Sequence, residues 1–119
     1  MRLAYLSLLM LLPICPPAAA QDRPKVMVWG DGVTSCGKFI QAMNENPENE
    51  VSFGQWLHGY ISGRNEADRL VRDHAAGIDR ESLMIWITNY CKSNPLDSFF
   101  VAASALISEL KAKGRIELR

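Results

Sequence analysis

The sequence predicts an all-α protein, a small bundle of about four helices joined by one disulfide between Cys36 and Cys91 and preceded by a cleaved signal peptide. Three observations lead to this prediction. Apolar residues recur at the spacing of one helical face in several segments, and stretches rich in Asn, Pro and Gly separate those segments. An export signal also leaves two cysteines in the mature chain.

Residues 1–20 have the three parts of a secretory signal peptide. Arg2 supplies the positive start, Leu3 to Leu12 the apolar region, and Ala18-Ala19-Ala20 the small residues of a cleavage site. The apolar run is shorter than the ~20 residues of a membrane-spanning helix. Cys15 offers a lipoprotein anchor as the alternative, but an isoleucine precedes it where lipidation signals carry a small residue. We expect cleavage after Ala20 and export, with the periplasm as the location.

The mature chain, residues 21–119, is long enough for one small domain. The full sequence carries 13 Lys and Arg against 13 Asp and Glu, for a formal net charge of zero. This balance provides no basic surface for nucleic acid or for an anionic membrane. We therefore expect no nucleic-acid partner and no membrane span.

Cys36 and Cys91 remain after cleavage, and an oxidising compartment normally joins such a pair. Metal binding or redox chemistry is the alternative, but C-x-x-C and closely spaced extra ligands are absent from the sequence. In the entropic model, a disulfide that closes a loop of this length stabilises the fold by roughly 4 kcal/mol. That is a large share of the about 5–10 kcal/mol expected for a small domain.

Residues 21–33 are predicted to form an exposed leader. In it, Val26–Trp29 lies along the helices as extended coil and Gly30-Asp31-Gly32 makes a turn. Thr34 or Ser35 then caps a first helix, which the polar loop 44–49 ends. The apolar face of this helix consists of Cys36, Phe39, Ile40 and Met43.

A second helix is predicted from Ser52, the N-cap of a capping box that Gln55 completes. Three glycines interrupt it, although each costs up to about 1 kcal/mol relative to alanine. Close approach of another helix is the usual reason, and a ligand against bare backbone is the alternative. The apolar face is Phe53, Trp56, Leu57, Tyr60 and Ile61, with polar ring atoms near the rim, and the glycines are Gly54, Gly59 and Gly63.

Residues 64–77 are charged and are predicted to be a solvated connection, in which Asp68 and Arg72 pair on a continued helix. Gly77 closes this connection. Asp79 then caps a third helix, with the neighbouring residues spaced as a hydrophobic staple. The apolar face of that helix is Leu83, Trp86, Ile87, Tyr90 and Cys91.

Asn94-Pro95 is predicted to start a fourth helix, with Asn94 as N-cap and Pro95 at the first helical position. Gly114 is the predicted C-cap, so the helical domain spans 34–114 and residues 115–119 form a tail. The apolar face of the fourth helix is Leu96, Phe99, Ala103, Leu106, Ile107 and Leu110, and Lys111 and Lys113 favour its C-terminal end.

The sequence contains no constellation of residues that predicts catalysis. His58 and His74 are far apart, with no free cysteine to join them in a zinc site. The G-x-S-x-G elbow of serine hydrolases is absent. Asp31 between two glycines fits a turn better than a calcium or phosphate site. We predict that the protein is not an enzyme and uses no cofactor and no metal.

Binding is the remaining class of function. Aromatic residues exceed what a two-helix seam needs, and the adjacent residues Phe99 and Phe100 cannot both follow one apolar stripe. One of them covers the disulfide or faces a partner, unless neighbouring helices bury both. The candidate partner-binding residues are Trp56, Tyr60, Trp86, Phe99 and Phe100.

Two cysteine motifs resemble those of the HdeA/HdeB acid-stress chaperones of the bacterial periplasm. Cys36-Gly37-Lys38-Phe39 resembles the first motif, and Cys91-Lys92-Ser93-Asn94-Pro95 resembles the second. The resemblance implies a small helical domain with one such disulfide and a homodimer at neutral pH. It also implies loosening in acid, which exposes apolar surface to hold unfolding client proteins. Protonating the 13 acidic residues gives the positive charge that this response requires.

A second resemblance is to the Tai-type immunity proteins, which neutralise secreted peptidoglycan amidases. It covers the segment from Trp56 to Gly63, WLHGYISG, and the run Tyr90…Asn94-Pro95…Ala102-Ala103. It implies an inhibitor with a fixed polar and aromatic patch that captures one protein partner at neutral pH. The chain lacks the additional cysteines usual in that family, whereas the chaperones usually lack the Trp- and Gly-rich helix. An envelope protein with another role is the third alternative.

Overall fold

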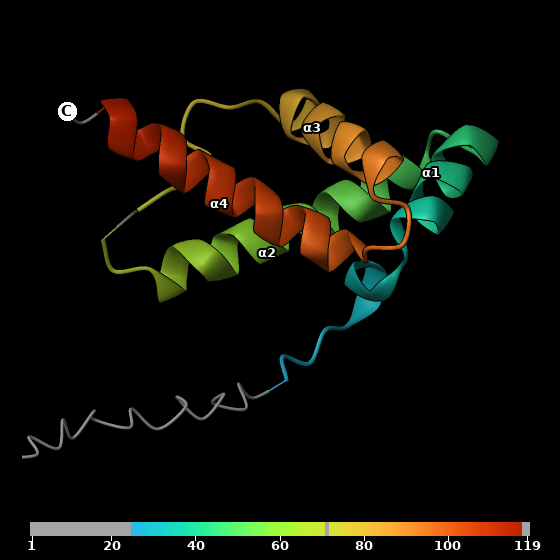
Figure 1. Cartoon of the computed structure of the whole chain (residues 1–119), viewed down its shortest axis with the longest axis horizontal. Helices are drawn as coiled ribbons and strands as arrows, with labels where there is room; N and C mark the ends of the chain where they lie inside the picture. Colours follow the sequence, from blue (N-terminus) through green and yellow to red (C-terminus); the bar gives the residue numbers. More distant parts are fainter. Residues whose placement is uncertain (1–24, 71, 118–119) are drawn as a thin grey trace, which may run out of the picture.

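The computed structural model describes residues 25–70 and 72–117, so the predicted signal peptide lies outside the described residues. Apart from one isolated bridge between Ser35 and Ser98, the described residues contain no β-structure. In Figure 1, α4 runs between α2 and α3 and contacts both. The prediction of an all-α fold with four helices is confirmed. The elements in order are the 3-10 helix η1 (Gly30–Val33), α1 (Cys36–Glu45), α2 (Asn49–Ala67), α3 (Arg80–Ser93) and α4 (Phe99–Glu117).

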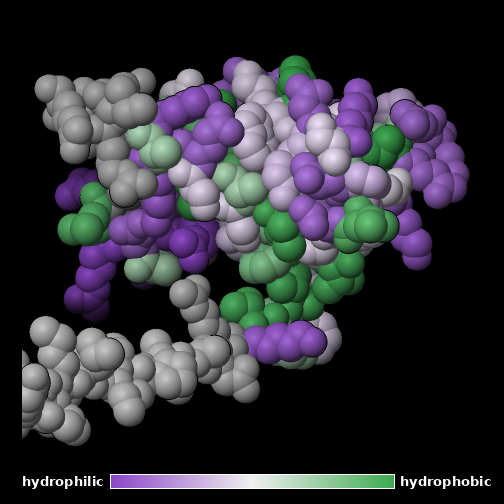
Figure 2. All heavy atoms as spheres, viewed as in Figure 1, coloured by the Kyte–Doolittle hydropathy of each residue, from purple (hydrophilic) through white to green (hydrophobic). Residues whose placement is uncertain are grey.

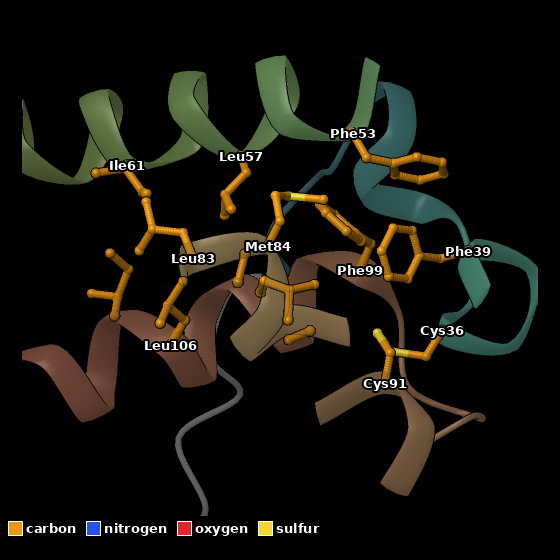
Figure 3. Close-up of a cluster of buried hydrophobic side chains, with 14 residues drawn as sticks. Cys36, Phe39, Phe53, Leu57, Ile61, Leu83, Met84, Cys91, Phe99 and Leu106 are labelled. Atoms are coloured by element: carbon orange, nitrogen blue, oxygen red, sulfur yellow. A yellow bond between two sulfur atoms is a disulfide. The ribbon is translucent and has the colours of Figure 1, made fainter. Parts of the chain in front are cut away.

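The core is built from the apolar faces that the periodicity predicts. Figure 3 shows Phe39, Phe53 and Phe99 converging from three different helices, with ring centroids 4.8 to 5.0 Å apart. Burial of such aromatic and aliphatic side chains is the main source of stability in a domain of this size. The buried apolar residues are Cys36, Phe39, Phe53, Leu57, Ile61, Leu83, Met84, Ile87, Cys91, Phe99, Ala102, Ala103, Leu106 and Ile107.

The predicted Cys36–Cys91 disulfide is present, and it joins the start of α1 to the end of α3. Both cysteines are fully buried. Beside them, the first turn of α1 bonds to the loop between α3 and α4. The amide of Cys36 donates to the carbonyl of Asp97 at 2.7 Å, and the amide of Gly37 donates to the carbonyl of Pro95 at 3.0 Å. This loop therefore satisfies helix-terminal donors that would otherwise need a side-chain cap or water.

Two predicted caps are confirmed. The Ser35 side chain accepts a hydrogen bond from the amide of Lys38, and the Asp79 side chain accepts one from the amide of Ser82. Each begins a helix at the predicted residue. Just before Asp79, Gly77 closes the preceding loop with a positive φ of 73°, a conformation that glycine adopts without strain.

The prediction of a capping box at Ser52 is wrong. α2 begins three residues earlier, at Asn49, so Ser52 lies inside the helix and its hydroxyl donates to the carboxylate of Asp31. The chain before α2 turns on Asn46, whose side chain accepts from the amide of Glu48 at 3.0 Å. A short Asx turn thus starts the helix where the sequence suggested only a polar loop.

The junction at Asn94-Pro95 also differs from the prediction. Asn94 closes the C-terminus of α3, because both its amide and its side chain donate to the carbonyl of Tyr90. α4 begins only at Phe99, where the Ser98 hydroxyl accepts from the amide of Val101. Leu96 therefore lies in the connecting loop and is 96% exposed, outside the apolar face assigned to it.

The prediction that the fourth helix ends at Gly114 is wrong. The helix continues through Gly114 to Glu117, so Gly114 is not a C-cap and the predicted tail begins inside the helix. Leu110, in the preceding turn, packs against the core as a partly buried residue.

The glycines of α2 do not share one explanation. A side chain at Gly54 would meet the Arg80 guanidinium at 2.6 Å, because that group crosses α2 to bond the carbonyl of Glu50. At Gly59 and Gly63 an added Cβ would meet nothing within 4 Å. The prediction that another helix approaches closely is therefore wrong for Gly59 and Gly63.

The predicted Asp68–Arg72 pair does not form on a continued helix, because α2 ends at Ala67 and Asp68 has extended backbone. Asp68 instead reaches α4, where its carboxylate lies 2.6 Å from the Lys111 ammonium. No helix in the described part of the chain is long and apolar enough to span a membrane.

Candidate protein-binding face

One groove brings together three of the predicted partner-binding residues. It has a volume of about 290 Å³ and lies between the leader segment and the helices α2 and α4. We call it the aromatic groove. Figure 2 shows hydrophobic side chains gathered where the chain enters the bundle. The residues that line the groove are Val26, Met27, Val28, Trp29, Trp56, Tyr60 and Phe100.

Trp56 is held in a single orientation by packing and by one hydrogen bond. Its ring stacks on Tyr60 at 5.5 Å with an interplanar angle of 7°, and it also meets the buried ring of Phe99 edge-on. Its indole nitrogen donates to the carbonyl of Trp29 at 2.8 Å. The prediction that the polar atom of Trp56 lies at the rim of the core fits this bond, which anchors the leader to α2.

Tyr60 and Phe100 form the second wall of the groove. The Tyr60 hydroxyl is 2.9 Å from the hydroxyl of Ser104, which in turn donates to the carbonyl of Phe100. Phe100 meets the Tyr60 ring edge-on at 5.5 Å. These contacts link α2 to α4 and fix the aromatic rings before any partner is present.

The leader is attached to the helices at its C-terminal end. A Cβ at Gly32 would lie 2.1 Å from the Trp56 ring, so only glycine allows this close approach. Ahead of it, Val26, Met27 and Trp29 are 67%, 71% and 77% exposed. The leader thus displays apolar side chains to solvent while its end is held in place.

The remaining two predicted residues lie elsewhere. Phe99 is fully buried in the core, so it supports Trp56 from beneath. Trp86 stacks on Tyr90 and donates from its indole nitrogen to the Glu109 carboxylate at 2.9 Å, away from the residues of the aromatic groove. Of the adjacent phenylalanines, one is therefore core and one lines the groove.

The helical spacing that points to Trp56 and Tyr60 does not extend to Val26, Met27 and Trp29, so the sequence predicts no binding role for these three residues. The sequence does contain a signal that these side chains are exposed. The apolar run before the Gly-Asp-Gly turn is too short to form a sheet by itself, so no neighbouring strand covers it. The predicted coil along the helices was found at Lys25–Trp29. Its exposed side chains are what extend the groove beyond the helices.

Charged contacts gather at the other end of α4. Hydrogen bonding to Lys111 lowers the pKa of Asp68, and the amide of Leu70 adds to this effect. Lys113 lowers the pKa of Glu109, with the Trp86 indole as a further donor. Both carboxylates are therefore held in their charged form by contacts on α4.

His74 is buried beside this charged cluster, with only 7% of its surface exposed. Its Nε2 lies 3.6 Å from the Asp68 carboxylate, and neither ring nitrogen has a hydrogen-bond partner among the described residues. The connection that was predicted to be solvated thus buries one polar ring. His58, in contrast, is exposed on α2.

Within the described residues, no three His, Cys, Asp or Glu side chains gather in a way that could hold a metal ion. Asp31 accepts from Ser52 and so fastens the leader turn to α2.

Comparison of the chain with models of protein families, with curated proteins and with solved structures finds no match. The two family resemblances therefore rest on the motif residues alone.

Proposed function

We propose that this chain is an exported protein-binding domain whose aromatic groove takes an apolar side chain from one protein partner. The observation that carries the proposal is the exposed apolar leader, which is bonded to Trp56 and lies beside two further aromatic rings. Tryptophan, tyrosine and other large apolar residues dominate the energy of protein interfaces. Because these rings are already ordered, little conformational entropy is lost when a partner binds.

Export is part of the proposal. The N-terminal pattern of Arg2, an apolar run and Ala-x-Ala has the form of a signal peptide. A buried disulfide in a small domain is typical of proteins that fold in an oxidising compartment. We place the mature protein in the periplasm.

The geometry favours a fixed binding patch, which is the mode expected of an immunity-type inhibitor of a secreted cell-wall amidase. The Trp56–Gly63 segment that resembles those proteins also supplies Trp56 and Tyr60 to the groove. Apolar surface is available in the folded state, so capture of a partner requires no unfolding step. An inhibitor of this kind would bind its enzyme stoichiometrically at neutral pH.

The test is binding to purified secreted amidases at neutral pH, beginning with any encoded beside this gene. Trp29→Ala and Phe100→Ala are each expected to weaken binding and inhibition by about tenfold or more, as for central interface residues. Leu96→Ala, an exposed apolar residue outside the groove, is the matched control and is expected to bind like the unmodified protein. Absence of binding to every amidase tested would remove the inhibitor proposal.

A second candidate function is the acid-stress chaperone, and a different observation favours it. Two carboxylates with lowered pKa values, Asp68 and Glu109, make contacts that fasten α4 to its neighbours, and acid would remove these contacts. The Cys36–Cys91 bond would keep the loosened chain connected. This function predicts that the protein prevents aggregation of an acid-sensitive client at about pH 2–3. Precipitation of the protein with its client would exclude it.

A further inference from the structure

A second groove shares no residue with the aromatic groove. It has a volume of about 360 Å³ and lies between α1, the first turn of α2 and one face of α3. We call it the α3 groove. Its floor is apolar, and Met84 is buried there. The residues that line it are Met43, Glu50, Glu81, Met84, Ile85, Thr88, Asn89 and Lys92.

Ile85 gives this face an apolar centre. It lies in the middle of α3 and is 61% exposed, although isoleucine is among the residues most often buried in folded proteins. Met43 beside it is a partly buried, flexible side chain that adapts to an incoming surface, whereas the buried Met84 forms the floor. The centre of the groove is therefore suited to an apolar contact.

Opposite charges mark the two ends of the same face. Glu81 lies in the first turn of α3 and Lys92 in its last turn, about 16 Å apart at the helical rise of about 1.5 Å per residue. Neither side chain forms an ion pair within the described part of the chain. Glu50 adds a second carboxylate at the Glu81 end, with the Arg80 guanidinium 4.0 Å from it.

We propose that the α3 groove is the interface between two copies of this chain, with the two α3 helices antiparallel. Placing a twofold axis between Trp86 and Ile87 sets Glu81 opposite Lys92 of the second copy, twice. The same axis sets Ile85 opposite Thr88 of the second copy, and the two Ile85 residues then lie about 4.5 Å apart along the helix axis, at about 1.5 Å per residue. Any helix places residues at the spacing of Glu81, Ile85, Thr88 and Lys92 on one face. What favours this pairing is that the face carries a negative charge at one end and a positive charge at the other. With like charges at both ends the same pairing would be repulsive.

A second copy satisfies this face without any further partner, because a twofold interface uses one surface that is complementary to itself. The lysine of each copy would meet the two carboxylates at the far end of the other. Antiparallel pairing also brings the helix dipoles into a favourable arrangement, since each N-terminus lies beside a C-terminus. The aromatic grooves stay free, so this proposal goes beyond partner binding and does not depend on it.

The test is the molar mass in solution of the exported, disulfide-bonded protein over a wide range of concentrations, by analytical ultracentrifugation. We expect twice the chain mass at high concentration. Ile85→Glu should weaken the dimer by about tenfold or more, because it places an unpaired charge at the interface centre. Leu96→Glu is the matched control on another exposed apolar residue and should leave the dimer unchanged.

Charge reversal tests the proposed register. Glu81→Lys and Lys92→Glu should each weaken the dimer, whereas the double variant should recover most of the loss by restoring opposite charges across the axis. Circular dichroism of each variant shows whether α3 is still folded. A monomer at every concentration would overturn the proposal. So would a dimer that is insensitive to Ile85→Glu, or one that Met27→Glu dissociates instead.

Discussion

The end of the bundle where α1 meets the α3–α4 loop is fastened covalently, whereas the end where the α2–α3 loop meets α4 is held by charge. At the first end, the Cys36–Cys91 disulfide and two backbone hydrogen bonds from the first turn of α1 join the elements. At the second end, the Asp68 carboxylate contacts the Lys111 ammonium beside the buried ring of His74. Figure 1 shows the two junctions at opposite sides of the molecule.

Because the two ends are held by different interactions, we expect them to respond to different conditions. A buried disulfide and backbone hydrogen bonds do not depend on pH in the acidic range. An ion pair with a carboxylate does, because protonation removes the negative charge. We therefore expect acid to weaken the contact at the charged end and to leave the disulfide-bonded end intact.

The largest expected effect is at the covalent end. Replacing Cys36 and Cys91 together by alanine should lower the free energy of unfolding by about 2–5 kcal/mol, because the unfolded chain regains the freedom that the 55-residue separation now restricts. Urea unfolding followed by circular dichroism measures this loss. A decrease well below 1 kcal/mol would mean that the backbone contacts alone hold this end. The statement that the disulfide fastens it would then be wrong.

A smaller effect of opposite sign is expected at the charged end. His74→Leu should raise the free energy of unfolding by about 1 kcal/mol at about pH 8, because it removes a buried polar ring whose nitrogens have no hydrogen-bond partner among the described residues. His58→Leu is the matched control on the exposed surface of α2 and should change stability by less than about 0.5 kcal/mol. Destabilisation by His74→Leu would show that the ring makes a stabilising bond, for instance to a buried water.

The same contrast explains what could be predicted from the sequence. The core faces were predictable because helical period alone places residues such as Phe39 and Leu57 inside. The helix ends were less predictable, because distant residues decide them. Ser52 has the pattern of a cap, but it bonds to Asp31, and the amides that begin α1 bond to the α3–α4 loop.

The candidate site was predicted in part for the same reason. Trp56 and Tyr60 lie on one helical face, so their proximity follows from spacing. Their meeting with Phe100 and with the leader depends on how α4 crosses α2 and on the indole bond to Trp29, which no local pattern encodes. The burial of His74 is likewise a result of tertiary packing.

The smallest effect concerns acid release of the charged end. The pKa of Asp68 is lowered in the folded chain, chiefly by Lys111. Its contact therefore contributes stability fully above the ordinary aspartate pKa of about 4 and loses that contribution as the pH falls through the lowered value. We expect amides of residues 72–79 and the last turns of α4 to lose protection from hydrogen exchange below about pH 4.

The variant Asp68→Asn sharpens this prediction. It should expose the same amides already at neutral pH and flatten their dependence on pH, while Glu66→Gln, an exposed neighbour on α2, should behave like the unmodified protein. Amides of residues 36–40, beside the disulfide, should keep their protection throughout. Loss of the Asp68 contact alone can release only the segment that this contact holds. If amides at both ends lost protection together, the bundle would be opening as one unit, and the prediction of local release would be wrong.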